Sequence, residues 1–253
     1  MDKNFGDAWT EVDDLIAEVV EIYKTSLRDV SKLKAAAAEG AAQKYSELLN
    51  TLQTNLNLLS DRLNSPINFP VGDPKLRSVL QGCVEELCTL QGLSTDIFSS
   101  GHYLVVFPVV VNFDQINNEV VTKIGANRFR STRPDFIVRK VAESLAAPFD
   151  KSQFTKSLKT AWQLLLKNER QSEVSLEDIR KAISVTSESV SSYSQDQFTA
   201  DLQRLFEYES DDARNQLPRL TPVAAASRQY LLFKRNGSST NYGALSFDQN
   251  ETE

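Results

Sequence analysis

The sequence predicts a mainly helical α+β protein, with a long N-terminal helical arm followed by a mixed, mostly helical body. Apolar residues recur at helical spacing through the first 63 residues. A valine-rich stretch near the middle of the chain has the character of a buried strand. Nine glycines and eight prolines among 253 residues are too few for a loop-rich all-β chain. This length is typical of one large domain or two modest ones.

The arm, residues 1–63, contains two blocks of apolar residues spaced three and four apart, as in a heptad repeat. The two blocks differ in phase, and Gly40, the only strong helix breaker, lies between them. The sequence therefore allows a hairpin that turns near Gly40 or one long helix. Because alanine is the best helix former and several alanines surround Gly40, we expect the continuous helix, straight or kinked.

The apolar stripe of the arm is a candidate assembly surface. It persists over most of residues 1–63 between polar faces, which predicts a coiled coil that binds a second copy or the helices of a protein partner. An intramolecular core is the ordinary alternative, and the bulky Trp9 and Tyr23 fit a helical bundle at least as well as a two-stranded coil. The predicted contact residues are Trp9, Ile16, Val19, Tyr23, Leu49, Leu52, Leu56 and Leu59.

Residues 64–75, with three prolines, are expected to connect the arm to a body that spans 76–247. The first half of the body predicts a helix to about Leu93, a loop over 94–101, a strand over 102–113 and a second strand over 120–129. Pro108 falls inside the first strand. Because proline cannot donate to a ladder, Pro108 marks an edge, a bulge or the division between two short strands.

The second half, residues 134–247, predicts helices followed by a terminal hairpin. Pro134 fits the first position of one helix, Asp150 resembles the N-cap of the next, and Ser175 is expected to cap a third. A fourth helix follows a serine-rich loop, and Asn236-Gly237 is typical of a turn between two strands. Three helices and a hairpin are what a winged-helix unit contains, although four-helix arrangements fit nearly as well. Residues 248–253 are expected to be a disordered tail.

Charge is unevenly distributed along the chain. Residues 123–170 contain 11 Lys/Arg and 4 Asp/Glu, a net of 11 − 4 = +7, whereas the whole chain has a net charge of −6. Such clustering predicts a surface for an anionic partner, either DNA or RNA bound through 128–140 or an acidic protein. An ordinary solvated face with ion pairs is the third interpretation. The candidate binding residues are Arg128, Arg130, Arg133, Arg139, Lys140, Lys156 and Lys159.

Catalytic motifs are scarce. His102 is the only histidine, so a Ser-His-Asp triad or a histidine-rich metal site has no other histidine to use. Pro134-Asp135 resembles the start of a metal-nuclease PD-(D/E)-x-K pattern, but Asp73-Pro74-Lys75, the only D/E-x-K in the chain, precedes it. Phosphate-binding glycine loops are absent from the sequence. We therefore expect no catalytic residues, metal or cofactor.

The N-terminal segment lacks both the basic and the apolar region of a signal peptide, and the longest apolar run is too short to span a bilayer. These features predict a cytoplasmic protein without membrane contact. The leading hypothesis is a non-enzymatic accessory or adaptor subunit of a multi-protein, nucleic-acid-associated assembly. The alternatives are a dimeric winged-helix DNA-binding regulator and a carboxylate-dependent metal nuclease.

Overall fold

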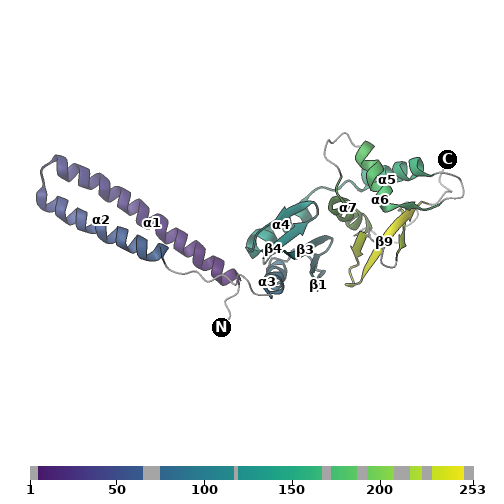
Figure 1. Ribbon diagram of the computed structural model, residues 1–253, viewed down its shortest axis with the longest axis horizontal. Helices are drawn as coiled ribbons and strands as arrows, with labels where there is room; N and C mark the ends of the chain where they lie inside the picture. The colour runs from purple at the N-terminus through teal and green to yellow at the C-terminus, as the bar shows by residue number, and fades with distance from the viewer. Residues whose placement is uncertain are drawn as a thin grey trace. The chain divides into compact units, whose positions relative to one another are not determined.

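The computed structural model describes residues 5–64, 75–116, 119–166, 172–186, 193–207, 217–223 and 230–247. The chain divides into two units, Met1–Asp73 and Pro74–Glu253 (Figure 1). Helices together with antiparallel sheets confirm the predicted α+β class. The predicted tail and nearly all of the predicted connector lie outside the described residues. Within the described part of the chain, no helix combines the length and apolar character needed to cross a membrane.

The first unit is a helical hairpin of α1 (Phe5–Ala38) and α2 (Ala42–Leu63). Gly40 has a left-handed φ of 69°, and the N–H of Ala41 donates to the carbonyl of Ala36 at 3.0 Å. The N–H of Gly40 donates to Ala37 at 3.2 Å, which completes a Schellman C-cap. The expected continuous helix is therefore wrong. Glycine adopts this conformation without steric cost, and the turn lets the two helices bury apolar side chains against each other.

The seam between α1 and α2 contains polar residues as well as leucines. Asp29 is only 5% exposed, and its Oδ2 accepts a 3.4 Å hydrogen bond from Nδ2 of Asn55 across the seam. Nearer the open end, Nε of Arg62 donates to Oε1 of Glu18 at 3.0 Å. Among the described residues, α2 has none that is fully buried. The hairpin therefore has only a thin apolar core of its own.

The second unit begins with a five-stranded antiparallel meander that has two helices on one face. Ser99 identifies this face, because its hydroxyl contacts Gln81 and Glu85 of α3 at 2.9 and 2.6 Å. Val109, Val111 and Phe113 alternate with half-buried residues along β3, as expected for a strand with one fully buried face. The elements are α3 (Leu76–Leu90), β1 (Ile97–Ser100), β2 (Tyr103–Val106), β3 (Val109–Ile116), β4 (Glu119–Ile124), β5 (Asn127–Phe129) and α4 (Pro134–Ala146).

Two predictions for this sheet have clear outcomes. Pro108 lies in the two-residue turn between β2 and β3, so it divides the predicted strand into two, one of the three stated alternatives. The predicted loop at 94–101 is wrong, because residues 97–100 form β1. Only four residues long and ending in two serines, β1 has little strand character of its own, and its ladder with β2 defines it.

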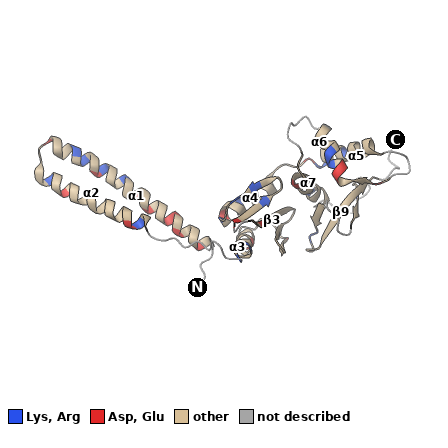
Figure 2. Cartoon of the chain, viewed as in Figure 1, with Lys and Arg blue, Asp and Glu red and all other residues tan. Residues whose placement is uncertain are grey.

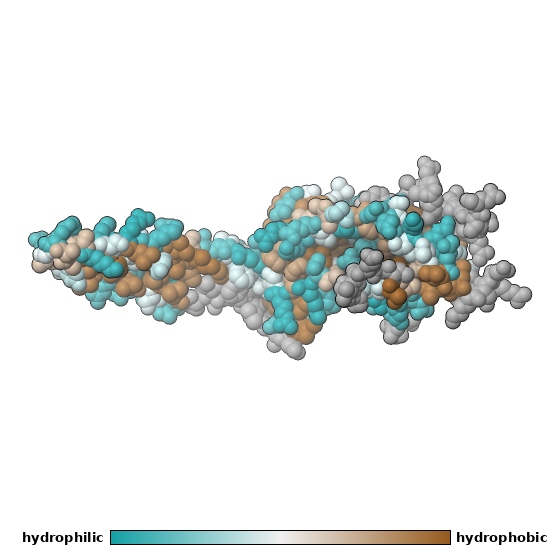
Figure 3. All heavy atoms as spheres, turned by 90° about the horizontal axis from the view of Figure 1, so that it is seen from above, coloured by the Kyte–Doolittle hydropathy of each residue, from teal (hydrophilic) through white to brown (hydrophobic). Residues whose placement is uncertain are grey.

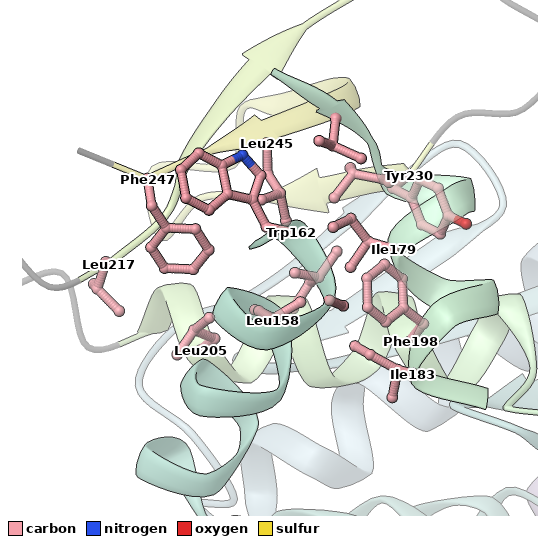
Figure 4. Packing of buried hydrophobic residues seen from close by; sticks show 14 of the residues in the cluster. Leu158, Trp162, Ile179, Ile183, Phe198, Leu205, Leu217, Tyr230, Leu245 and Phe247 are labelled. Carbon is pink, nitrogen blue, oxygen red and sulfur yellow. The ribbon is translucent and has the colours of Figure 1, made fainter. Parts of the chain in front are cut away.

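The rest of the second unit surrounds a larger core, shown in Figure 4. Trp162, Phe198, Tyr230 and Leu245 meet there from different helices and strands, and Nε1 of Trp162 donates to the carbonyl of Ser172 at 3.0 Å. Strand β9 pairs antiparallel with β6, β7 and β8. The elements are α5 (Lys151–Leu165), β6 (Val174–Ser175), α6 (Leu176–Thr186), α7 (Gln195–Glu207), β7 (Arg219–Pro222), β8 (Tyr230–Phe233) and β9 (Ser239–Ser246).

Helix starts in this unit follow the sequence signals. Pro134 occupies the first turn of α4, and Oδ1 of Asp150 accepts a 2.8 Å hydrogen bond from the backbone N–H of Gln153. The predicted proline start and the predicted Asp150 cap are therefore both confirmed. A small cluster of Val105, Phe107 and Phe233 packs the meander against β8.

Candidate interaction surfaces

The basic segment, residues 128–140, covers β5, the following loop and the first two turns of α4. Most of its cations have a carboxylate nearby. Arg130 lies 3.9 Å from Glu119, and Arg133 lies 3.2 Å from Asp135. Glu143 lies 4.0 Å from Arg139 and 2.6 Å from Lys140.

Ion pairing reduces the charge of the basic segment but leaves it accessible. Five cations with three carboxylates give 5 − 3 = +2 for Arg128, Arg130, Arg133, Arg139 and Lys140 with their partners Glu119, Asp135 and Glu143. The side chains of Arg130 and Arg139 are 80% and 66% exposed. Exposed pairs of this kind contribute about 0–1 kcal/mol, so an anion can replace the carboxylates. Figure 2 shows blue residues on α4.

The cations of the segment do not share one flat surface. Arg128 is the cross-strand neighbour of Lys123, so both lie on the sheet face opposite α3 and α4. Phe129 points to the other face, where its ring packs edge-on against Phe136 at 5.6 Å. The guanidinium of Arg139 lies 5.4 Å from the Phe136 ring. The segment therefore wraps around the β5 edge of the sheet, and Phe129 is half-buried rather than a free platform for a base.

Lys156 and Lys159 lie on α5, which packs against α6 and α7 in the larger core. Arg139 and Lys140 lie on α4, which packs against α3 and the meander. The predicted basic residues are therefore divided between two parts of the second unit with different cores, a division that net charge along the sequence does not reveal.

A cleft of about 490 Å³ lies where the end of the meander meets α7 and the C-terminal end of α4. Its lining includes Lys123, Lys140, Asn112 and Asp196. Nζ of Lys123 lies 2.8 Å from Oδ2 of Asp114, and Asn112 Oδ1 is buried without a hydrogen-bond partner among the described residues. Burial, followed by the nearby Asp114 carboxylate, raises the pKa of Tyr103 in the same lining. Sequence reasoning missed this cleft because its walls come from distant parts of the chain.

The predicted assembly residues alternate between two faces of the hairpin. Val19, Leu52 and Leu59 are half-buried, as is Trp9. The remaining predicted residues, Ile16, Tyr23, Leu49 and Leu56, are exposed. With three neighbours they form what we call the outer stripe. Its members are 41–61% exposed: Ile16, Val20, Tyr23, Leu27, Leu49, Leu56 and Leu63.

The two halves of the outer stripe lie on the same side of the hairpin. On α1 each outer-stripe residue comes one position after a residue in the seam between α1 and α2, as Tyr23 follows Ile22. On α2, Leu49 follows Leu48 in the same way. Successive residues of an α-helix are rotated by about 100° around the helix axis, so the outer stripe lies about 100° from the seam on each helix. Because α1 and α2 run in opposite directions, equal turns bring both halves to one side. Figure 3 shows a brown apolar band along the hairpin.

The described residues give no new candidate for a catalytic residue. His102 stacks with Tyr103 at 4.0 Å between ring centroids, and Asp135 is paired with Arg133. Cys83 and Cys88 do not form a disulfide, and burial raises the pKa of Cys88 to about 11. In the part of the chain that the structure describes, no group of three or more His, Cys, Asp or Glu side chains is placed to hold a metal ion. Asp73 and Pro74 of the D/E-x-K pattern lie outside that part.

Comparisons of this chain with protein-family models, with curated proteins and with solved structures gave no match.

Proposed function

We propose that this protein is a non-enzymatic accessory or adaptor subunit, which joins a multi-protein assembly through its hairpin and offers the basic segment to an anionic partner. The observation that carries the proposal is the outer stripe, an apolar face of the hairpin that the packing of α1 against α2 leaves uncovered. Burying one large aliphatic side chain is worth about 1.5–3 kcal/mol. A continuous face of such residues is typical of a protein–protein contact.

The hairpin has the pattern of half a helical bundle. Helices of a four-helix bundle bury one seam against each of two neighbours. Here α1 and α2 bury one seam against each other, and the outer stripe supplies the residues for a second. Further helices packed on this side complete the bundle and give α2 the buried positions that it lacks.

The basic segment supports the anionic-partner half of the proposal. Arg128, Arg130 and Arg139 are exposed, and arginine forks match phosphate and carboxylate groups better than lysine does. DNA, RNA and an acidic protein surface share this anionic chemistry. The net +2 of the segment is modest, which suits a contact that supplements a larger apolar interface.

The order of elements from α5 to β9 resembles that of a winged-helix unit: helix, short strand, two helices, then strands that pair with β9. In helix-turn-helix proteins the recognition helix presents its side chains to the major groove. The corresponding α7 packs against β3 and β8, and Asp196 adds negative charge to its first turn. This placement favours an assembly role over that of a dimeric DNA-binding regulator.

One experiment tests the assembly half. The tagged full-length protein is purified from its native cells, with and without nuclease, and its partners are identified by mass spectrometry. Leu56→Glu places a charge in the outer stripe, whereas Leu58→Glu changes a leucine of similar exposure two residues away, about 200° around the helix. We expect Leu56→Glu to lose the partners and Leu58→Glu to retain them. Equal retention by both variants contradicts the proposal.

A second experiment tests the basic segment. Duplex DNA, single-stranded RNA and polyglutamate serve as fluorescent probes across a salt titration. Arg128→Glu/Arg130→Glu is compared with Lys75→Glu/Lys234→Glu, the same charge change on exposed lysines elsewhere. We expect the arginine variant alone to weaken binding at least about tenfold and to flatten the salt dependence for a nucleic acid. Failure of the native protein to bind any probe at low salt contradicts this half of the proposal.

A further inference from the structure

We infer that the outer stripe is covered by a second copy of this chain, with the two hairpins packed antiparallel as a four-helix bundle. This inference rests on the proposed assembly role of the hairpin and names its partner. Three properties of the hairpin carry it: the one-sided outer stripe, the charge distribution along α1, and the two charged residues within the stripe.

Charge is segregated along α1. Its first half, residues 5–21, contains six Asp/Glu and no Lys/Arg, and its second half, residues 22–38, contains four Lys/Arg and one Asp. Helix α2 adds two residues of each sign, Lys44, Glu47, Asp61 and Arg62. The open end of the hairpin is therefore acidic, and the half near the Gly40 turn is basic.

This segregation selects one orientation for a second copy. If two hairpins pack with their turns at the same end, acidic halves face acidic halves and basic halves face basic halves. If the turns lie at opposite ends, each acidic half faces the basic half of the other copy. A two-fold axis across the outer stripe produces this antiparallel arrangement and uses the same surface on both chains, as expected for an isologous dimer.

The outer stripe contains its own pair of complementary charges. If the spacing of the outer stripe is continued along α1 in both directions, it reaches Asp13 toward the acidic end and Lys34 toward the basic end. The midpoint of positions 13 and 34 falls beside Tyr23. A two-fold axis at Tyr23 therefore brings Asp13 of each copy to Lys34 of the other, with the apolar residues of the stripe between the two pairs.

The test uses the purified full-length protein and light scattering coupled to size exclusion over a range of concentrations. We expect a mass of twice 28.3 kDa for the native chain. Leu56→Glu is expected to yield monomer and Leu58→Glu to remain dimeric, because only Leu56 belongs to the outer stripe. Far-UV circular dichroism shows whether each variant keeps its helices.

Charge exchange tests the orientation. In the antiparallel dimer, Asp13→Lys places like charges together twice, and we expect the dimer to dissociate about tenfold more readily. Asp13→Lys/Lys34→Asp restores both pairs and the native dissociation constant. In a two-fold parallel dimer, α1 of one copy packs against α2 of the other, so residue 13 does not meet Lys34 and the double exchange restores nothing.

A monomeric native chain overturns the inference, as does a dimer that Leu56→Glu leaves intact. A dimer that is indifferent to Asp13→Lys overturns the antiparallel arrangement. The proposed function is judged separately: if the native chain is monomeric but Leu56→Glu loses protein partners from cells, the assembly role stands and the second copy is wrong.

Discussion

The side-chain amide of Gln203 pairs with both backbone groups of Phe233. Nε2 donates to the Phe233 carbonyl at 2.8 Å, and the Phe233 N–H donates to Oε1 at 2.8 Å. Gln203 is 2% exposed and lies on α7, whereas Phe233 ends β8 and packs its ring beside Val105 of the meander. The pair therefore joins the helix to the strand at the point where the two parts of the second unit meet.

Replacing Gln203 with leucine is expected to lower the free energy of unfolding of the second unit by about 2–4 kcal/mol. The change leaves two buried backbone groups without partners, and each costs about 1–3 kcal/mol when unsatisfied. Urea denaturation followed by the fluorescence of Trp162 measures the effect. Gln163→Leu, an exposed position on α5, is the matched control and should stay within about 0.5 kcal/mol of the native chain. Equal stability of the two variants contradicts the prediction.

The hydrogen bonds of the Glu177 carboxylate are expected to make the free energy of unfolding depend on pH in the acid range. Its Oε1 accepts from Nη2 of Arg180 at 2.8 Å, and its Oε2 accepts from the Tyr230 hydroxyl at 2.8 Å. The hydrogen bond from Arg180, assisted by that from Tyr230, lowers the pKa of Glu177 from 4.5 to about 2. Because the folded pKa is the lower one, the stabilisation is complete above about pH 4.5 and is lost as the pH falls toward 2.

The expected contribution of Glu177 above pH 4.5 is on the order of 3 kcal/mol, since each pKa unit corresponds to about 1.4 kcal/mol. Unfolding free energies of the native chain and of Glu177→Gln are compared from pH 2 to pH 7. The difference between them should grow through this window and then become constant. A difference that is the same at every pH shows that the Glu177 charge has no part in folding.

Local signals in the sequence locate many elements of the fold. Pro134 and Asp150 mark helix starts, and Pro108 divides the first predicted strand, because each acts on the backbone within a few residues. The Gln203 pair and strand β1 escape this reasoning. Their partners, Phe233 and the β2 ladder, come from other elements, and nothing local to Gln203 or to residues 97–100 indicates them.

The candidate surfaces show a different limit. The heptad pattern locates the apolar residues of the arm, but it merges two faces: Val19 belongs to the seam and Ile16 to the outer stripe. The two faces of α1 can be distinguished only by the position of α2, which packs against the seam and leaves the outer stripe exposed. Likewise, clustering of Arg and Lys identifies the basic segment, but the carboxylates that offset it, such as Glu119, come from a neighbouring strand.

Two glycines predict opposite effects of the same substitution. Gly40→Ala is expected to destabilise the hairpin by about 1–2 kcal/mol, because alanine is strained at a φ of 69°. Gly82 lies on the exposed face of α3, where an added methyl group meets only open space, so Gly82→Ala should stabilise the second unit by about 0.5–1 kcal/mol. Thermal melts by circular dichroism measure both. Stabilisation by Gly40→Ala contradicts the hairpin turn.

A side chain introduced at Gly243 on β9 is expected to clash with Val223, and shortening Val223 should relieve the clash. A Cβ at this position falls 2.6 Å from Cγ1 of Val223, whose short branched side chain has few ways to move. We expect Gly243→Ala to lower the unfolding free energy by about 1–3 kcal/mol, the usual cost of overpacking. In Val223→Ala/Gly243→Ala the clashing methyl groups are removed, so the double variant should lose less stability than the two single changes predict together. Additive losses in urea denaturation show that β9 accepts a side chain here without contact to Val223.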